Sequence, residues 1–253
     1  MSDAMAFERI GIFGDIHGNM VAFAAVLAAL QAEGIDRLVC LGDVAASGPQ
    51  PREVVQRLSA LRCPVVMGNA DEEVLNPPDP AVGADEDMQR IREIDRWTAA
   101  QLSADERAFV AGFASTVTFP LADGGSLLCY HGSPHSYDDI LLPTTPADEL
   151  DALLGDATAT VLAGGHTHQQ MLRRHHKALV INPGSVGLAF DRVPPGPGTR
   201  NPSWAEYAVL TGRAGDLRVE LRRARFDGAA LVAAARASGM PHAEWYASDW
   251  ETA

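Results

Sequence analysis

Seven side chains that can bind a metal ion or move a proton follow short apolar runs of this sequence. They are Asp15, His17, Asp43, Asn69, His131, His166 and His168. Each lies at or just after the end of a predicted strand, and parallel strands bring their carboxyl ends to one edge of a sheet. We therefore expect all seven side chains to gather at that edge.

Taken singly, each of these residues has an ordinary explanation. A Gly-Asp pair such as Gly42-Asp43 often forms a turn or caps a helix, and a lone histidine such as His131 is often structural. Their combination favours a shared site. Four of the eight histidines fall at predicted strand ends, beside two aspartates and one asparagine.

The donor types indicate which ions would bind. Imidazole, carboxylate and amide oxygen suit Mn, Fe, Co, Ni or Zn, and no thiolate accompanies them. Seven ligands are too many for one such ion but fit two ions that share a carboxylate. Two ions about 3.5–4 Å apart suit in-line displacement at phosphorus, because they hold both the attacking and the leaving oxygen.

The elements that would position these residues alternate between strand and helix. Strands are predicted at residues 10–13, 37–41, 64–67, 126–130 and 159–163, where short apolar runs end in glycine or in a polar residue. Helices are predicted at residues 20–32 and 51–61, which have no internal glycine or proline. This alternation favours βαβ units with right-handed crossovers and a mostly parallel sheet.

Other segments depart from this rhythm within what we expect to be a single domain over residues 1–253. Residues 76–114 contain two predicted helices, which either form a cap over the edge of the sheet or pack as ordinary helices. Residues 203–253 are predicted to add two strands and a terminal helix, followed by an aromatic-rich stretch that docks either onto the body or onto a partner. Residues 192–202, rich in proline and glycine, are predicted to form a loop.

The composition narrows the class of protein. The net charge of −13 argues against a broad basic surface for nucleic acid, although a metal site can still attract a small anion. No signal-peptide pattern and no membrane-spanning apolar stretch is found, which predicts a cytoplasmic location. Cys40, Cys63 and Cys129 are far apart and odd in number, so we expect reduced thiols.

In their order along the chain, these polar residues resemble the five motif blocks of the calcineurin-like metallophosphoesterases. The blocks are Asp15-x-His17, Gly42-Asp43, Gly68-Asn69-x-Asp71, His131 and Gly165-His166-x-His168. The resemblance spans about residues 10–186. Residues 15–19 and the block Asn182-Pro183-Gly184-Ser185 are similar to the small bacterial and archaeal phosphodiesterase branch. That branch implies a four-layer α/β/β/α sandwich of two mixed β-sheets flanked by helices.

The same resemblance implies roles for individual residues. One ion would take Asp15, His17 and His168, the other would take Asn69, His131 and His166, and Asp43 would bridge them. Mn²⁺ is the first choice of ion, with Fe, Ni, Co or Zn as alternatives, and a metal-bound hydroxide would attack phosphorus. Asp71 would serve the catalytic site as the orienter of the third motif. The predicted substrate contacts are Asn69, Gly184 and Ser185, although Gly184-Ser185 also suits a plain turn.

The chain departs from the family pattern at Ala70. The family has His, or in the small branch often Cys, between the residues equivalent to Asn69 and Asp71. That histidine is credited with protonating the leaving group or holding a substrate oxygen, and an alanine can do neither. The nearest substitute by sequence is His135, in the loop after His131.

These observations predict a dinuclear metal-dependent phosphodiesterase that acts on a small organic or nucleotide-like phosphate ester. Three alternatives stay open: a phosphomonoesterase or nucleotidase, a hydrolase of dinucleoside polyphosphates, and a non-catalytic scaffold on the same fold. The expected partner is the small-molecule substrate, with no membrane and no broad nucleic-acid surface. A homo-oligomer is left open.

Overall fold

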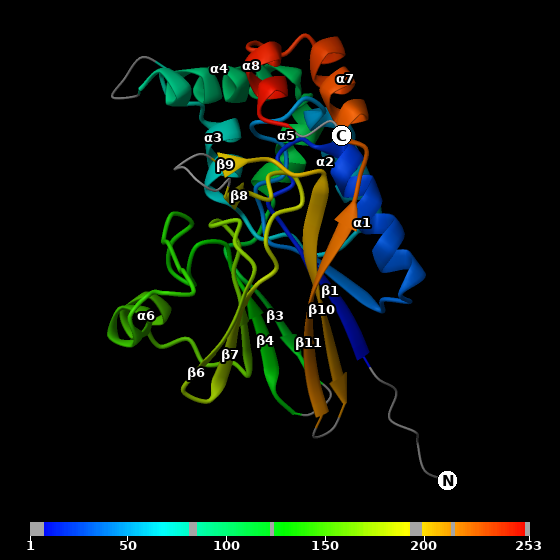
Figure 1. Cartoon of the computed structure of the whole chain (residues 1–253). Helices are drawn as coiled ribbons and strands as arrows, with labels where there is room; N and C mark the ends of the chain where they lie inside the picture. The colour runs from blue at the N-terminus through cyan, green and yellow to red at the C-terminus, as the bar shows by residue number, and fades with distance from the viewer. Residues whose placement is uncertain (1–7, 81–84, 122–123, 193–198, 214–215, 251–253) are drawn as a thin grey trace.

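Two mixed β-sheets pack face to face in this structure, a computed structural model that describes residues 8–80, 85–121, 124–192, 199–213 and 216–250 (Figure 1). The first sheet has the strand order β11-β10-β1-β2, the second has the order β3-β4-β5-β7-β6, and β8 and β9 form a separate ladder. The strands are β1 (Glu8–Phe13), β2 (Arg37–Cys40), β3 (Val117–Pro120), β4 (Ser126–Cys129), β5 (Val161–Ala163), β6 (Met171–His175), β7 (Ala178–Asn182), β8 (Asp191–Arg192), β9 (Thr199–Arg200), β10 (Trp204–Arg213) and β11 (Asp216–Arg225).

Helices cover the outer faces of both sheets and complete four layers. Figure 1 shows α1 and α6 on opposite sides of the pair of sheets. The helices are α1 (Met20–Ala32), α2 (Pro51–Leu61), α3 (Asn69–Leu75), α4 (Glu86–Gln101), α5 (Ala104–Ala111), α6 (Ala147–Leu154), α7 (Gly228–Ser238) and α8 (Ala243–Ser248). The predicted sandwich of two mixed sheets flanked by helices is confirmed.

Alternation along the strands explains the layers, because successive side chains point to opposite faces. On β1, Ile10 and Ile12 belong to one buried cluster with Leu127 and Ala163 of the second sheet. The next residue in the alternation, Phe13, belongs instead to the cluster that the first sheet shares with α1 and α2. A third cluster joins the outer face of the second sheet to α6.

Local sequence explains where the helices near the expected site begin. Asn19 caps α1, since its Oδ1 accepts the amide hydrogen of Ala22 at 2.9 Å. Pro51 occupies the first turn of α2, where its missing N–H would have no partner in any case. Ser103 and Glu106 form a capping box at the start of α5. These caps fix the direction in which each helix leaves its loop.

Strand pairing differs from the expectation in two places. The prediction of a mostly parallel sheet is wrong: β1 is parallel to β2 but antiparallel to β10, which returns from the C-terminal hairpin. The parallel set in the second sheet is β4-β5-β7. The predicted strand at residues 64–67 makes only isolated bridges, through Val65 and Val66. Pro64 lacks an amide hydrogen and α3 begins at Asn69, so few residues are left to pair.

The two segments outside the strand–helix rhythm pack on each other at one end of the molecule (Figure 1). Ile94 of α4 shares a buried cluster with Leu231 of α7, Tyr246 of α8 and Trp250. Of the two predicted outcomes for the aromatic-rich stretch, docking onto the body is the one observed, through Trp250. Residues 251–253 lie outside the described residues. The role of residues 76–114 as a cap, and the single-domain organisation, stay predictions; residues 81–84 are also outside the described ranges.

Three smaller expectations can be compared with the structure. The prediction of a loop at residues 192–202 is partly wrong, because β8 and β9 pair there. Residues 193–198 are not among those described. All three cysteines are free thiols, as expected. Among the helices described, none is both long enough and apolar enough to cross a bilayer.

Candidate metal centre

The seven predicted ligands lie in loops that follow β1, β2, β4 and β5, and at the start of α3. Backbone hydrogen bonds join the first two loops: Asp15 N donates to Gly42 O at 2.8 Å and His17 N donates to Asp43 O at 3.0 Å. Five of the ligands have a positive φ, namely Asp15, His17, Asp43, His166 and His168. Residues with side chains seldom adopt this conformation, and proteins retain it mainly at functional sites. Backbone strain is therefore concentrated where these side chains converge.

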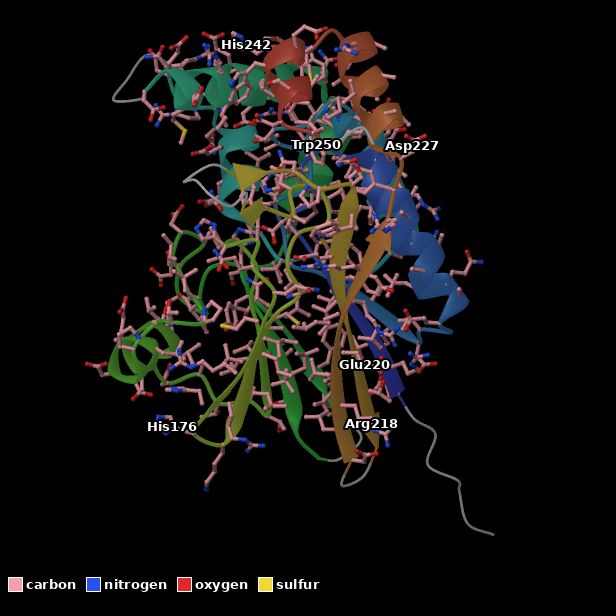
Figure 2. The ribbon with its side chains drawn as sticks, in the orientation of Figure 1. His176, Arg218, Glu220, Asp227, His242 and Trp250 are labelled. Atoms are coloured by element: carbon pink, nitrogen blue, oxygen red, sulfur yellow. The ribbon has the colours of Figure 1, made fainter. Side chains whose placement is uncertain are left out.

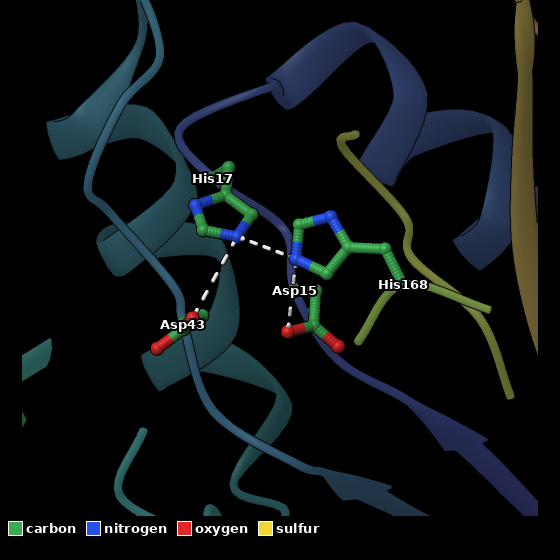
Figure 3. Close-up of side chains that lie close together, drawn as sticks. All are labelled: Asp15, His17, Asp43 and His168. Atoms are coloured by element: carbon green, nitrogen blue, oxygen red, sulfur yellow. Dashed lines mark hydrogen bonds and ion pairs between the residues drawn. The ribbon is translucent and has the colours of Figure 1, made fainter. Parts of the chain in front are cut away.

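The first group, here called the Asp15 cluster, consists of Asp15, His17, Asp43 and His168 (Figure 3). The Nε2 atoms of His17 and His168 lie 3.1 Å apart. His168 Nε2 is 3.3 Å from Asp15 Oδ1, and His17 Nε2 is 3.7 Å from Asp43 Oδ2. Ligand atoms about 3.3 Å apart are what tetrahedral coordination at about 2.0–2.2 Å requires. The cluster therefore has nearly the spacing of a metal site.

The second group, the His131 cluster, consists of Asp43, Asn69, His131 and His166. Asn69 Oδ1 lies 3.1 Å from His131 Nε2 and 3.0 Å from His166 Nδ1. His131 Nε2 is 3.3 Å from Asp43 Oδ2. Because Asp43 belongs to both clusters, the structure places two candidate sites side by side with one carboxylate between them.

Two buried atoms of the Asp15 cluster test whether a cation fits. Asp15 Oδ2 and His17 Nδ1 have no hydrogen-bond partner within the described ranges. A buried carboxylate oxygen without a partner is costly, and a cation beside it would remove that cost. The imidazole, carboxylate and amide donors match a borderline divalent ion. The donors of the Asp15 cluster therefore fit a cation of this type.

Burial and neighbouring charges favour the metal-binding protonation state of His17 and Asp43 but oppose that of His131. Burial, followed by the neighbouring His168, lowers the pKa of His17 to about 4, so its ring is neutral at pH 7. Burial alone would lower the pKa of His131, but Asp43, Asp15 and the Leu41 carbonyl together raise that pKa to about 10. Burial alone would raise the pKa of Asp43, but His131, His17 and His168 together lower the pKa of that carboxyl. A cation at the His131 cluster must displace this proton.

Two glycines of the motif blocks allow the loops to approach the aspartates. A Cβ on Gly165 would lie 2.8 Å from Asp15 Oδ2. A Cβ on Gly68 would meet the carboxylate of Asp43 and lie 2.7 Å from its amide nitrogen. Because side chains do not tolerate such contacts, close packing around the two aspartates requires glycine at both positions.

Comparison with known proteins assigns the chain to a family. A family model described as the calcineurin-like phosphoesterase superfamily domain matches residues 9–199, well over half of the chain. The chain belongs to the calcineurin-like phosphoesterases. It is therefore a phosphoester hydrolase of a metal-dependent family.

Individual relatives of this phosphoesterase are distant in sequence but similar over nearly their whole length. The uncharacterized protein MJ0912 of Methanocaldococcus jannaschii is 24% identical over 244 residues, which cover 88% of this chain and 90% of that protein. A metallophosphoesterase from Sphaerobacter thermophilus has a TM-score of 0.73 at 25% identity, covering 96% of this chain and 97% of the other. The hypothetical protein PH1004 from Pyrococcus horikoshii OT3 has a TM-score of 0.75 at 20% identity, covering 95% and 96%.

Asp71 of the phosphoesterase supports the loop of Asp43 from outside both clusters. Its Oδ2 accepts the amide hydrogens of Asp43 at 2.8 Å and Gly68 at 3.0 Å, and its Oδ1 accepts that of Val44 at 2.9 Å. Burial, followed by the charge of Asp43, raises the pKa of Asp71 to about 7. Because amides occupy both oxygens, Asp71 contacts Asp43 only through the backbone, and its predicted role in the catalytic site stays a prediction.

The residues predicted to face the substrate have different surroundings. Asn69 lies in the His131 cluster. The Ser185 hydroxyl is buried, donates to Asp15 O and accepts from Leu188 N, both at 2.8 Å. The Gly184 amide donates to Asn182 Oδ1 at 2.8 Å. These bonds belong to a turn that holds the Asp15 loop, and contact of this turn with a substrate stays a prediction.

Neither Ala70 nor His135 brings a proton donor to the clusters. The Ala70 side chain is buried in the apolar cluster between the first sheet and its helices, and its amide donates to Asp43 Oδ1 at 2.9 Å. The ring of His135 lies at the end of α6, with Nε2 4.0 Å from Asp156 Oδ1. His135 therefore faces α6. The sequence had suggested this residue as a substitute acid for the site.

Two features beside the clusters had no signal in the sequence. Asp95 of α4 accepts the amide and the hydroxyl of Ser47 at 2.7 and 3.0 Å, which ties α4 to the loop after Asp43. A cavity of about 310 Å³ opens next to Asn69, and its other lining residues are Glu72, Glu73, Asn76, Pro78 and Asp138. An acidic residue on a helix or loop is ordinary in sequence, so only the folded chain shows these neighbours.

Proposed function

We propose that the chain is a dinuclear metal-dependent phosphodiesterase that hydrolyses a small organic or nucleotide-like ester. The observation that carries this proposal is the position of Asp43 in both clusters. A pair of divalent ions bound there would make water nucleophilic at neutral pH and would neutralise charge on the phosphoryl oxygens. Mn²⁺ is the first ion to test, and Fe, Ni, Co and Zn are the alternatives.

The side chains divide the work of holding and aligning the two ions. In this proposal the ligands of one ion are Asp15, His17 and His168, those of the other are Asn69, His131 and His166, and Asp43 serves both. Asp71 fixes the Asp43 loop through backbone amides. Ser185 fixes the Asp15 loop through the carbonyl of Asp15. The supports are rigid because all of these groups are at least partly buried and hydrogen-bonded.

Charge beside the His131 cluster favours an ester with a single negative charge. Glu72, Glu73 and Asp138 line the cavity next to Asn69, and Arg92 offsets part of the charge of Glu73. A phosphodiester carries one negative charge near neutral pH, whereas a phosphomonoester or a dinucleoside polyphosphate carries more. Acidic walls repel the more highly charged esters more strongly, which supports a diester substrate.

The test compares bis(p-nitrophenyl) phosphate with p-nitrophenyl phosphate on protein stripped of metal and reloaded with Mn²⁺. We expect the diester to be hydrolysed faster and two ions to stay bound after passage over a chelating resin. Asp43→Asn should lose both ions and the activity, while Asp105→Asn, an exposed control on α5, should lose neither. Faster cleavage of the monoester would favour the phosphomonoesterase, and two tightly bound ions without hydrolysis of any ester would favour the scaffold.

A further inference from the structure

A third group of side chains with metal-binding donors lies on α6 and the turn between β6 and β7. It consists of Asp151 on α6, His175 at the end of β6 and His176 in the turn, and is here called the Asp151 cluster. The Nε2 atoms of both histidines lie 2.7 Å from the same oxygen, Asp151 Oδ1. The two ring centroids are 4.3 Å apart.

The Asp151 cluster is separate from the site described above. β7 runs parallel to β4 and β5, so its carboxyl end, at Asn182, shares the edge of the sheet where the predicted ligands lie. His175 and His176 precede the amino end of β7 and therefore lie at the opposite end of the sheet. Figure 2 shows His176 at the end of the molecule away from His242 and Trp250.

We propose that Asp151, His175 and His176 bind one divalent ion of the Zn²⁺ type, which joins α6 to the β6–β7 turn. Two imidazoles and one carboxylate form a donor set that suits Zn²⁺, Ni²⁺ or Cu²⁺ far better than Mg²⁺ or Ca²⁺. The three protein ligands come from two elements and leave a coordination position for water. The ion would thereby fasten the helix that covers the second sheet.

The geometry needs only a small adjustment to accept the ion. Each Nε2 points at Asp151 Oδ1. In the tautomer with the proton on Nδ1, the lone pair of Nε2 points in the same direction and can bind an ion. An ion about 2.0–2.2 Å from each ligand requires the ligand atoms to separate to about 3.3 Å. The Asp151 side chain is 51% exposed and the His176 side chain 71% exposed, so both can move outward by this amount.

The surroundings hold the two histidine rings in place. His175 is buried and fixed by its ladder pairing with Ala178, and His176 has a φ of 50°, a conformation that favours glycine or asparagine. Lys177 and Asp151 both line the adjoining cavity of about 400 Å³. Because the Asp151 and His176 side chains are more than half exposed, we expect a weaker site than the buried clusters that share Asp43.

The test follows the imidazole nitrogens by long-range ¹H–¹⁵N NMR. Protein loaded with two equivalents of Zn²⁺ is titrated with more Zn²⁺, and the Nε2 signals of His175 and His176 should shift together with a stoichiometry of one. His176→Ala should weaken binding of this ion by more than about 100-fold, since the loss even of a group that only supports a ligand costs about 10–100-fold. Hydrolysis of bis(p-nitrophenyl) phosphate by protein with two Zn²⁺ should be unchanged.

His242→Ala is the matched control. His242 also has a positive φ, 57°, and its Nε2 lies 2.6 Å from Glu93 Oε2, but it belongs to no such group of donors in the described part of the chain. Binding should be unchanged in this variant. If His176→Ala disturbs folding, Asp151→Asn serves as the test variant. It keeps an oxygen acceptor for the two histidines but loses the charge, so it should still weaken Zn²⁺ binding. Signals of His175 and His176 that do not move with added Zn²⁺, or equal binding by the His176 and His242 variants, would overturn the proposal.

Discussion

Asp71 Oδ2 accepts the amide hydrogen of Asp43 at 2.8 Å, so one buried carboxylate holds another through the backbone. Asp71 is 0% exposed and Asp43 is 3% exposed. Two acids so close and so deeply buried repel each other, which contributes to the raised pKa of Asp71. Hydrogen bonds from three backbone amides offset the cost of burying the Asp71 carboxylate, and divalent ions would offset the cost of burying that of Asp43. Asp71 is therefore expected to matter for metal binding although it touches no proposed ion.

Asp71→Asn should weaken metal binding and lower kcat together. Asparagine keeps one acceptor oxygen, but its NH₂ group would face one of the amides of Asp43, Val44 and Gly68, and two donors repel each other. The loss of such a supporting group typically costs about 10–100-fold in metal affinity or activity. Titration with Mn²⁺ followed by kinetics with saturating metal measures both effects, with Asp105→Asn as the exposed control. Wild-type affinity in Asp71→Asn would show that the amides alone suffice.

The absence of a proton donor at Ala70 should appear in the choice of leaving group. General-acid catalysis typically contributes about 10²–10⁴-fold and matters most for poor leaving groups. The rate should therefore fall steeply from aryl to alkyl diesters as the pKa of the leaving alcohol rises. Because the ring of His135 lies beside Asp156, His135→Ala should show the same slope. A shallow slope in the wild type that steepens in His135→Ala would instead assign the acid to His135.

The seven candidate ligands could be predicted because their signal is local. Each follows an apolar run, and parallel pairing brings together the ends of β1 and β2 in one sheet and those of β4 and β5 in the other. The expectation of one shared sheet edge is wrong, because packing of the two sheets against each other joins the two sets of ends. The mixed first sheet could not be predicted, since β10 pairs with β1 from almost two hundred residues away. The Asp151 cluster could not be predicted for a similar reason. His175 and His176 are adjacent, but Asp151 lies 24 residues before His175 on a helix. Such neighbours arise from tertiary packing, which residue spacing does not encode.

Asp95 should make the stability of the protein fall as the pH rises through the weakly acid range. Burial raises the pKa of Asp95 from 3.8 to about 7. Between these values the folded chain binds a proton that the unfolded chain has lost, so the free energy of unfolding decreases as the pH rises from about 4 to about 7. Asp95→Asn cannot ionise and still accepts hydrogen bonds from Ser47. The variant should match the wild type near pH 4.5 and exceed it by about 2–4 kcal/mol at pH 8.

Urea unfolding at pH 4.5 and pH 8 in the presence of a chelator measures this difference, because bound metal would add its own stabilisation. Asp105→Asn, exposed on α5, should follow the wild type at both pH values. Equal dependence on pH in the wild type and Asp95→Asn would contradict the prediction, and would mean that the hydrogen bonds from Ser47 keep Asp95 ionised at little cost.

The acidic cavity beside Asn69 should set the charge preference of the enzyme. Glu72→Gln combined with Glu73→Gln removes two of the three carboxylates that line the cavity while keeping side-chain size. We expect a gain in kcat/KM of roughly two- to tenfold for the dianion p-nitrophenyl phosphate and a smaller gain for the monoanion bis(p-nitrophenyl) phosphate, because repulsion scales with the charge of the ester. At 0.5 M NaCl, where the Debye length falls to about 4 Å, both gains should shrink. Glu149→Gln, exposed on α6, is the control and should change neither substrate. Equal gains for the two esters, or gains that persist in high salt, would mean that the glutamates act through the shape of the cavity and that its charge does not select the substrate.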